Sequence, residues 1–235
     1  MPHPLRRSRE VQKAETRHRL IECAHVVFLS SGFHTATLEA IALQAGVTKG
    51  AVYSNFESKA ELFLAVSGTR MEERLRNYRK LSATITRLET LVREYARVML
   101  RDDPDGRWAS VVAEACAVAT GDERFRAALI EQSARGNAVI ADAIVDMARR
   151  AGVEFQLPRQ KMSRISAALV RGLLLQRLLD PKGVSREFIE DALVSFIQGM
   201  AEPQASTGRK REHVQHFPAS RPGRRSAPRR RAERA

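Results

Sequence analysis

The chain has only two cysteines, Cys23 and Cys116, which are too few for a disulfide framework or for a zinc site made of two cysteine pairs. Both fall inside apolar helical patterns, where a cysteine packs as a small apolar side chain. Among the six histidines, only His213 and His216 have a ligand-like spacing, and they lie in a Pro/Arg-rich segment without a cysteine. We therefore expect no metal site and no cofactor.

Long apolar runs are also absent. No stretch approaches the roughly 20 apolar residues that a membrane-spanning helix needs. The N-terminal residues lack the apolar segment of a secretory signal peptide. These absences argue against a membrane protein and predict a cytoplasmic one.

Aromatic residues make up only 6% of the chain, and no segment alternates apolar and polar residues for long enough to predict a strand. Alanine, leucine, arginine and glutamate are abundant instead, a mix that favours helices. The composition therefore predicts an all-α protein. Its 235 residues are enough for one sizeable domain or for a small domain joined to a larger one.

The net charge of +13 is unevenly distributed. Residues 1–19 carry +4 and residues 202–235 carry +7, which leaves +2 for residues 20–201. Two basic ends on a nearly neutral body indicate contact with a polyanion through the ends, although tails that only increase solubility explain the charge equally well. We expect residues 1–14 to form a flexible basic arm and residues 202–235, rich in Arg and Pro, to be disordered.

Helical spacing of apolar residues predicts about nine helices. The first runs from about Glu15 to Gly32, where a left-handed cap would end it. Two short helices at about 38–45 and 49–55 follow, and then a longer helix opens with the capping box Ser58-Lys59-Ala60-Glu61. Five more helices are expected at about 84–101, 107–119, 122–151, 160–179 and 185–200.

The segment from Thr37 to Lys59 reads TLEAIALQAGVTKGAVYSNFESK and has the parts of a helix-turn-helix. Ala42 is small where the two helices must approach closely, and Gly46 can adopt the left-handed backbone of a tight turn. In such a motif the first helix crosses the DNA backbone while the second enters the major groove. An ordinary helical hairpin is the alternative. The wedge between the helices would be filled by Ile41, Val47, Val52 and Phe56.

The outward residues of the second helix suit a nucleic-acid surface. Lys49 stands at its start, where recognition helices reach base edges, and Gly50 leaves the backbone open to close approach. The hydroxyls of Thr37 and Thr48, together with helix N-terminal amides, suit phosphate oxygens. Lys59 is expected to face the DNA backbone. The remaining predicted contacts are Tyr53, Ser54 and Asn55.

Residues 16–66 resemble the DNA-binding domain of the TetR/AcrR family of bacterial repressors. The matching features are Ser31-Gly32-Phe33, Thr35-Ala36-Thr37, Ile41-Ala42, Ala45-Gly46-Val47, Gly50-Ala51-Val52-Tyr53, Asn55-Phe56, and Lys59 with Leu62-Phe63. All eight predicted contact residues match positions where this family contacts DNA, although many relatives have His in place of Asn55. The resemblance implies a helix-turn-helix domain at 15–57, a connecting helix at 58–82, and a helical effector-binding and dimerisation domain at 83–201.

The resemblance also implies that the helices at about 160–179 and 185–200 pair with those of a second subunit. Each carries an apolar stripe with a glycine, Gly172 or Gly199, that would let backbones come close, although periodicity alone favours an intramolecular core. Polar or aromatic residues within the apolar helices could line an effector pocket, although each is also explained as a surface or core residue. These candidates are Trp108, Glu114, Cys116, Asn137 and Arg171.

Together these features predict a homodimeric transcriptional regulator that binds a palindromic operator in double-stranded DNA and senses a small-molecule effector. It would act as a repressor or, less often, as an activator. A nucleoid-organising protein with little sequence preference is the alternative. An enzyme is not expected, because the chain shows no phosphate loop or catalytic grouping. Asp102, Asp103 and Asp105 resemble part of a calcium loop, but Pro104 and a missing terminal glutamate argue against one.

Overall fold

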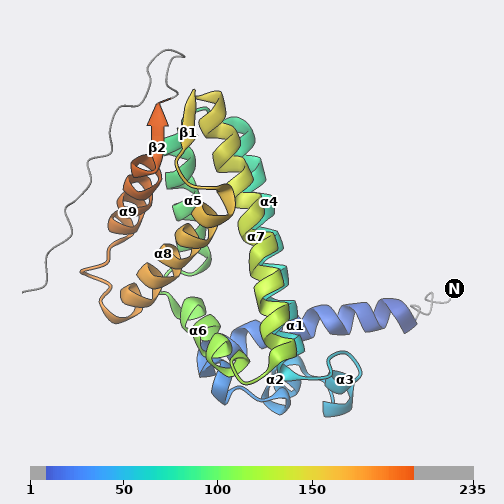
Figure 1. Cartoon of the computed structure of the whole chain (residues 1–235). Helices are drawn as coiled ribbons and strands as arrows, with labels where there is room; N and C mark the ends of the chain where they lie inside the picture. Colours follow the sequence, from blue (N-terminus) through green and yellow to red (C-terminus); the bar gives the residue numbers. More distant parts are fainter. Residues whose placement is uncertain (1–8, 204–235) are drawn as a thin grey trace, which may run out of the picture. The chain divides into compact units, whose positions relative to one another are not determined.

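The computed structural model describes residues 9–203, in which it shows nine α-helices and two short strands (Figure 1). The prediction of an all-α fold is confirmed. The predicted arm and tail fall largely outside the described residues, at 1–8 and 204–235. No helix in the described part is long and apolar enough to cross a membrane. The helices are α1 (Arg9–Thr35), α2 (Leu38–Ala45), α3 (Lys49–Tyr53), α4 (Lys59–Thr84), α5 (Leu88–Asp102), α6 (Arg107–Ala119), α7 (Glu123–Arg150), α8 (Arg159–Leu179) and α9 (Arg186–Gly199).

Helix α1 extends beyond both of its predicted ends. It starts at Arg9, inside the predicted arm, rather than near Glu15. Gly32 interrupts it with φ 78° and ψ 167°, a conformation that essentially only glycine adopts. A last turn forms beyond this point, where the N–H of Ala36 donates to the carbonyl of Gly32 at 3.3 Å. Gly32 therefore breaks the helix at the residue where the pattern predicted its end, and α1 also includes the short turn that follows the kink.

Five aromatic residues gather where the N-terminal helices meet α6 and α7. Phe28 and Phe33 of α1 pack against Phe63 of α4, with ring centroids 5.7 and 5.1 Å apart. Trp108 of α6 stacks on Phe63 at 5.6 Å, and Phe125 of α7 stacks on Phe33 at 5.8 Å. Such pairs contribute about 0.5–1.5 kcal/mol each beyond burial. The cluster therefore fastens the N-terminal helices to α6 and α7.

A second core lies among α5, α7, α8 and α9, joined by the end of α4. Apolar residues every three to four positions give each of these helices a buried face. Within this core the fully buried side chains include Tyr78, Leu91, Met162, Ile189 and Leu193.

Two strands were not predicted. Strand β1 (Val153–Phe155) pairs antiparallel with β2 (Ala201–Pro203), with Glu154 opposite Glu202. Three residues are too few for an alternating pattern to show in the sequence. Strand β2 includes positions 202 and 203, which the composition places in the disordered tail. The pairing attaches the segment after α9 to the end of α7.

Candidate DNA-binding surface and central cavity

Side-chain caps and a glycine turn define the helix-turn-helix. The hydroxyl oxygen of Thr37 accepts a hydrogen bond from the N–H of Ala40 at 3.1 Å, and that of Thr48 accepts one from Ala51 at 3.2 Å. Each bond satisfies a donor in the first turn of α2 or α3. Between the helices, Gly46 is left-handed, with φ 64° and ψ 35°. The local turn therefore has the predicted geometry.

The inner face of α3 is buried against α2. Ile41 and Val52 have no exposed surface, and Phe56 is 1% exposed. Val47 is half-buried against the same core. All four residues that were predicted to fill the wedge between the helices therefore contribute to it, and they fix which side of α3 faces outward.

The outer face of α3 is open to solvent. Lys49, Gly50, Tyr53 and Ser54 are all exposed. The Lys49 ammonium forms an ion pair with Glu39 of α2 and lies 5.8 Å from the centroid of the Tyr53 ring. Its hydrogen bond to Glu39 raises the pKa of Lys49 and lowers the pKa of the carboxyl group. In the described structure, Lys49 is therefore held on the outer face by a neighbouring carboxylate.

Gly50 leaves a gap on this surface. A Cβ added there would come no closer than 3.9 Å to any neighbouring side chain, the nearest atom being the Thr48 hydroxyl oxygen. The Ser54 hydroxyl already donates its proton within the helix, to the carbonyl of Ala51 at 2.9 Å. The backbone at the start of α3 is thus accessible to a large partner.

Asn55 turns its side chain toward the protein, contrary to its assumed role as an outward contact. Its amide nitrogen donates to the carbonyl of Ala51 at 2.8 Å, and its buried Oδ1 has no hydrogen-bond partner among residues 9–203. The Arg17 guanidinium donates to the main-chain carbonyl of Asn55 and lies 4.0 Å from the centroid of the Phe56 ring. Arg17 was missed because a contact between residues far apart in the sequence leaves no local pattern.

Lys59 is also held by the protein rather than extended from it. Its ammonium donates to the carbonyls of His34 at 2.9 Å and Ala36 at 2.8 Å, and it lies 4.9 Å from the centroid of the Phe33 ring. Burial lowers the pKa of Lys59, and the charge of Glu114 opposes this effect. These contacts clamp the end of α1 to the start of α4, a role that its place in the capping box did not reveal.

A cavity of about 130 Å³ lies between α4, α5, α6, α7 and α8. Three of the five candidate pocket residues, Trp108, Asn137 and Arg171, line it. The other two do not: Cys116 is exposed, and Glu114 accepts a hydrogen bond from the backbone N–H of His34 at 2.9 Å. The wall is largely apolar with a few polar groups, as in sites for small molecules.

Two charged residues of the cavity wall are buried and held by hydrogen bonds. Arg74 of α4 is buried, and its Nε donates to the carboxylate of Asp102 at 3.1 Å. Asp103 is also buried and accepts hydrogen bonds at 2.9 Å from the backbone N–H groups of Trp108 and Ala109, at the start of α6. The segment 102–106, predicted only as a break between helices, thus supplies the cap of α6.

Helix α6 connects the cavity with α1. Trp108 lines the cavity and also packs against His25 of α1, with ring centroids 5.1 Å apart. Further along the same helix, Glu114 holds the backbone of His34 just after the kink in α1. A shift of α6 would therefore be transmitted to α1 at two points.

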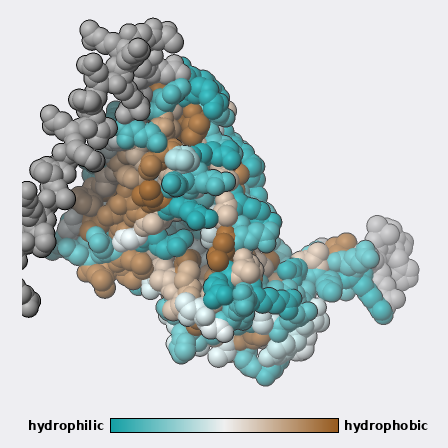
Figure 2. Space-filling view, viewed as in Figure 1, coloured by the Kyte–Doolittle hydropathy of each residue, from teal (hydrophilic) through white to brown (hydrophobic). Residues whose placement is uncertain are grey.

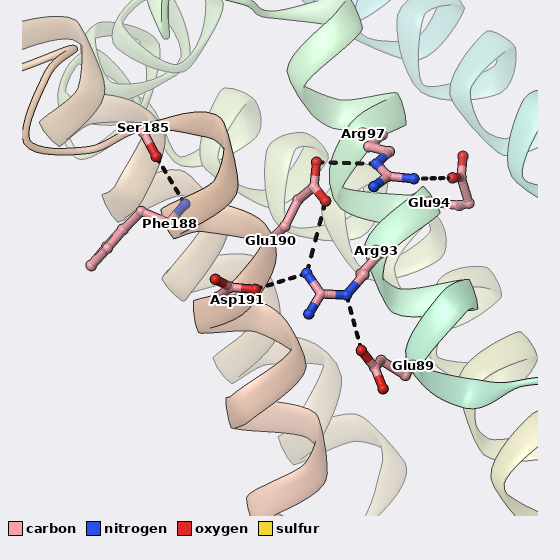
Figure 3. Close-up of polar contacts among 8 residues, drawn as sticks. All are labelled: Glu89, Arg93, Glu94, Arg97, Ser185, Phe188, Glu190 and Asp191. Atoms are coloured by element: carbon pink, nitrogen blue, oxygen red, sulfur yellow. Dashed lines mark hydrogen bonds and ion pairs between the residues drawn. The ribbon is translucent and has the colours of Figure 1, made fainter.

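An ion-pair network holds α9 on α5 (Figure 3). Arg93 of α5 contacts Asp191 at 2.8 Å and Glu89 at 3.1 Å. Arg97 contacts Glu190, which is largely buried, at 3.1 Å. Because α9 is held on this side, its opposite face is left for other contacts.

That opposite face and the adjoining face of α8 are apolar and exposed (Figure 2). Phe188 points away from α5 and is 50% exposed (Figure 3), while Ile165 and Leu179 are 43% and 86% exposed. Gly172 and Gly199 also lie on these helices, and a Cβ at either would meet nothing within 4 Å. Part of the apolar stripe of α8 and of α9 therefore packs in the core, and the rest of each stripe is exposed to solvent.

The fold and this surface are those of a helix-turn-helix transcriptional regulator. Residues 20–66 match the family model described as bacterial regulatory proteins, tetR family. Residues 85–202, half of the chain, match the model of the BetI-type transcriptional repressor C-terminal domain. The chain belongs to the TetR family of bacterial regulators and has a BetI-type C-terminal domain.

Relatives and solved structures agree with this assignment. The HTH-type transcriptional regulator SrpR of Pseudomonas putida is 45% identical over 64 residues, or 27% of this chain and 30% of the relative. The first curated relatives are matched over less than half of their own length.

Two solved structures share the fold over most of the chain. A regulator from Saccharomonospora viridis in complex with choline has a TM-score of 0.64 and 21% identity over 80% of this chain and 99% of its own. The FadR regulator from Bacillus subtilis in complex with stearoyl-CoA has a TM-score of 0.61 and 15% identity over 77% and 96%.

Proposed function

We propose that this regulator is a repressor that binds a palindromic operator and leaves it when a small molecule occupies the central cavity. One observation carries the proposal: α3 has a buried inner face, a glycine turn before it and an open outer face that begins with Lys49 and Gly50. The C-terminal match to a repressor model favours repression.

We assign the direct contacts to the start of α3 and its flanks. Lys49 would exchange its partner Glu39 for a base edge in the major groove. The Thr37 and Thr48 hydroxyls accept capping bonds and still have a proton to donate to phosphate oxygens. Tyr53 supplies a further exposed donor. Before either could donate to DNA, Ser54 would have to break its bond to the carbonyl of Ala51, and Asn55 would have to give up its bond to Ala51 or its bond to the Ser54 hydroxyl.

Two copies would associate through the exposed faces of α8 and α9. Removing Phe188, Ile165 and Leu179 from water favours association, and the open glycine positions allow close backbone approach. A two-fold dimer presents two α3 helices, so its operator should contain two half-sites about one helical turn apart, or a multiple of that distance.

Release by a ligand follows from the position of α6 between the cavity and α1. A ligand that contacts Trp108 would shift α6, and Glu114 would transmit this shift to the end of α1, through its hydrogen bond with His34. The two structural neighbours with bound small molecules support a ligand site in this class of fold. Ligand and DNA must then weaken each other's binding by the same factor.

Selection of bound DNA from a random pool with the full-length protein tests the proposal. We expect a palindrome to be enriched and to be protected from nuclease at moderate salt. Replacing Lys49 with Ala should change the preferred base at one position in each half-site, by roughly fivefold to 150-fold in relative affinity. Lys80→Ala, an exposed lysine on α4, is the matched control. Equal binding to all sequences would instead identify a nucleoid-organising protein.

A further inference from the structure

The charges on the cavity wall leave a positive excess. Arg74 is paired with Asp102. Asp103 is the only acidic residue on the wall among residues 9–203, and both of its oxygens accept backbone N–H groups from the first turn of α6. The two other charged groups are Arg70 of α4 and Arg171 of α8.

Arg70 is available for a further partner. Within residues 9–203 it forms an ion pair with Glu73, with 3.5 Å between Arg70 Nη1 and Glu73 Oε2. Glu73 does not line the cavity, and its side chain is 43% exposed. Exposed pairs of this kind are weak, so a buried anion in the cavity would compete effectively with Glu73 for Arg70.

A second donor lies one helical turn from Arg70. The Ser67 hydroxyl is buried, lines the cavity and has no hydrogen-bond partner among residues 9–203. Residues three apart on a helix lie on the same face, so Ser67 and Arg70 present a hydroxyl and a guanidinium side by side. A buried hydroxyl without a partner is unfavourable, and an oxygen atom of a ligand would satisfy it.

The cavity does not suit a cation. Aromatic side chains that could hold one already pack against other rings, since Trp108 lies between Phe63 and His25 at centroid distances of 5.6 and 5.1 Å. In the described part of the chain, the three arginines on the wall, Arg70, Arg74 and Arg171, against the single carboxylate of Asp103, would also repel an incoming cation.

We propose that the central cavity binds a small organic anion, with its carboxylate on Arg70 and Ser67 and an apolar ring or short chain against Trp108 and Val112. The volume of about 130 Å³ is close to that of engineered cavities of about 150 Å³ that hold benzene, so one ring or a chain of similar size fits. This assignment rests on the proposed function only in treating the anion as the effector.

The single tryptophan gives a direct measure of occupancy, because Trp108 lines the cavity and is the only tryptophan in the chain. The full-length protein is titrated with benzoate, hexanoate, benzamide and choline, followed by Trp108 fluorescence and by calorimetry. We expect benzoate or hexanoate to bind once per chain, with benzamide and choline about tenfold weaker or more, because bonds to charged groups carry that much affinity.

Variants locate the anion. Arg70→Gln and Ser67→Ala should each weaken binding of the better anion, the first by about tenfold or more. Arg76→Gln, an exposed arginine on the same helix, is the matched control and should bind like the parent protein. Circular dichroism establishes that each variant is folded. The inference is overturned if choline or benzamide binds as tightly as the anions, if neither anion binds, or if R70Q binds benzoate unchanged.

This experiment separates the ligand inference from the proposed function. Operator selection is carried out without any ligand, so a palindrome can be found even if no anion binds, which overturns the anion assignment alone. Conversely, binding of benzoate that depends on Arg70 supports the assignment even if no operator is found. If benzoate binds and operator affinity stays unchanged, the cavity assignment stands while release by this ligand fails.

Discussion

Glu114 and His34, 80 residues apart, are joined by a hydrogen bond of 2.9 Å from the backbone N–H of His34 to the Glu114 carboxylate. The absence of a side chain at Gly32 leaves room for this contact, because a Cβ at that position would lie 2.7 Å from the same carboxylate oxygen. The backbone of Gly32, at φ 78°, is also one that other residues rarely adopt. Space and backbone conformation therefore both require glycine here.

Replacing Gly32 with Ala should reduce the free energy of unfolding by about 1–3 kcal/mol, the cost of a side chain in this backbone conformation. Urea denaturation followed by circular dichroism measures the change. Gly121→Ala is the control, because its Cβ would make only an ordinary contact of 3.7 Å with the carbonyl of Val118. Equal stability of the Gly32 variant and the parent protein would show that the kink is not needed.

Replacing Gly50 with Ala should separate folding from DNA binding. The added Cβ meets open space, and alanine favours helix over glycine by about 0.5–1 kcal/mol, so the variant should be at least as stable as the parent. Its affinity for the selected operator should fall, because the methyl group fills the gap that DNA would enter. Fluorescence anisotropy with a labelled operator measures this loss. Undiminished binding would argue against close approach at Gly50.

Replacing Lys59 with Ala should destabilise the N-terminal helices, because two carbonyls lose their donor. We expect a loss of about 1–2 kcal/mol in the free energy of unfolding. The salt dependence of operator binding should stay unchanged in the folded variant. If Lys59 contacted a phosphate, as the sequence alone indicates, the slope of log affinity against log salt would fall by roughly 0.9. Binding measured over a range of salt concentrations distinguishes the two roles.

Replacing Phe188 with Glu should prevent association of two copies, because the dimer interface would then have to bury a charge on α9. Sedimentation analysis should show monomers, and operator affinity should fall because the dimer is lost. Ile130→Glu is the matched control, since Ile130 is 60% exposed on α7, a helix outside the proposed interface of α8 and α9. A dimer that persists in the Phe188 variant would place the interface elsewhere.

Local features of the chain were predictable because they depend on neighbouring residues. The caps at Thr37, Thr48 and Ser58 and the left-handed turn at Gly46 were all expected, since each is set by one residue and the helix beside it. Strands of three residues fall below what an alternating pattern can show, and β1 and β2 were missed for that reason.

Contacts between distant segments were not predictable in the same way. The turning of Asn55 toward Ala51, the pairing of Arg17 with its carbonyl and the clamp formed by Lys59 depend on how α1 and α4 pack around α3. Lys59 looked like a basic residue at a helix start, and only the path of residues 34–36 showed where its ammonium lies.

The sequence by itself determined the helical class, the helix-turn-helix and the family, because helical periodicity, glycine turns and caps are short-range properties that the order of residues encodes. Only the tertiary structure decided which polar residues face the central cavity, which part of each apolar stripe stays exposed, and where α6 meets α1. These depend on packing between helices that lie far apart along the chain, where burial and charge are set by several elements at once.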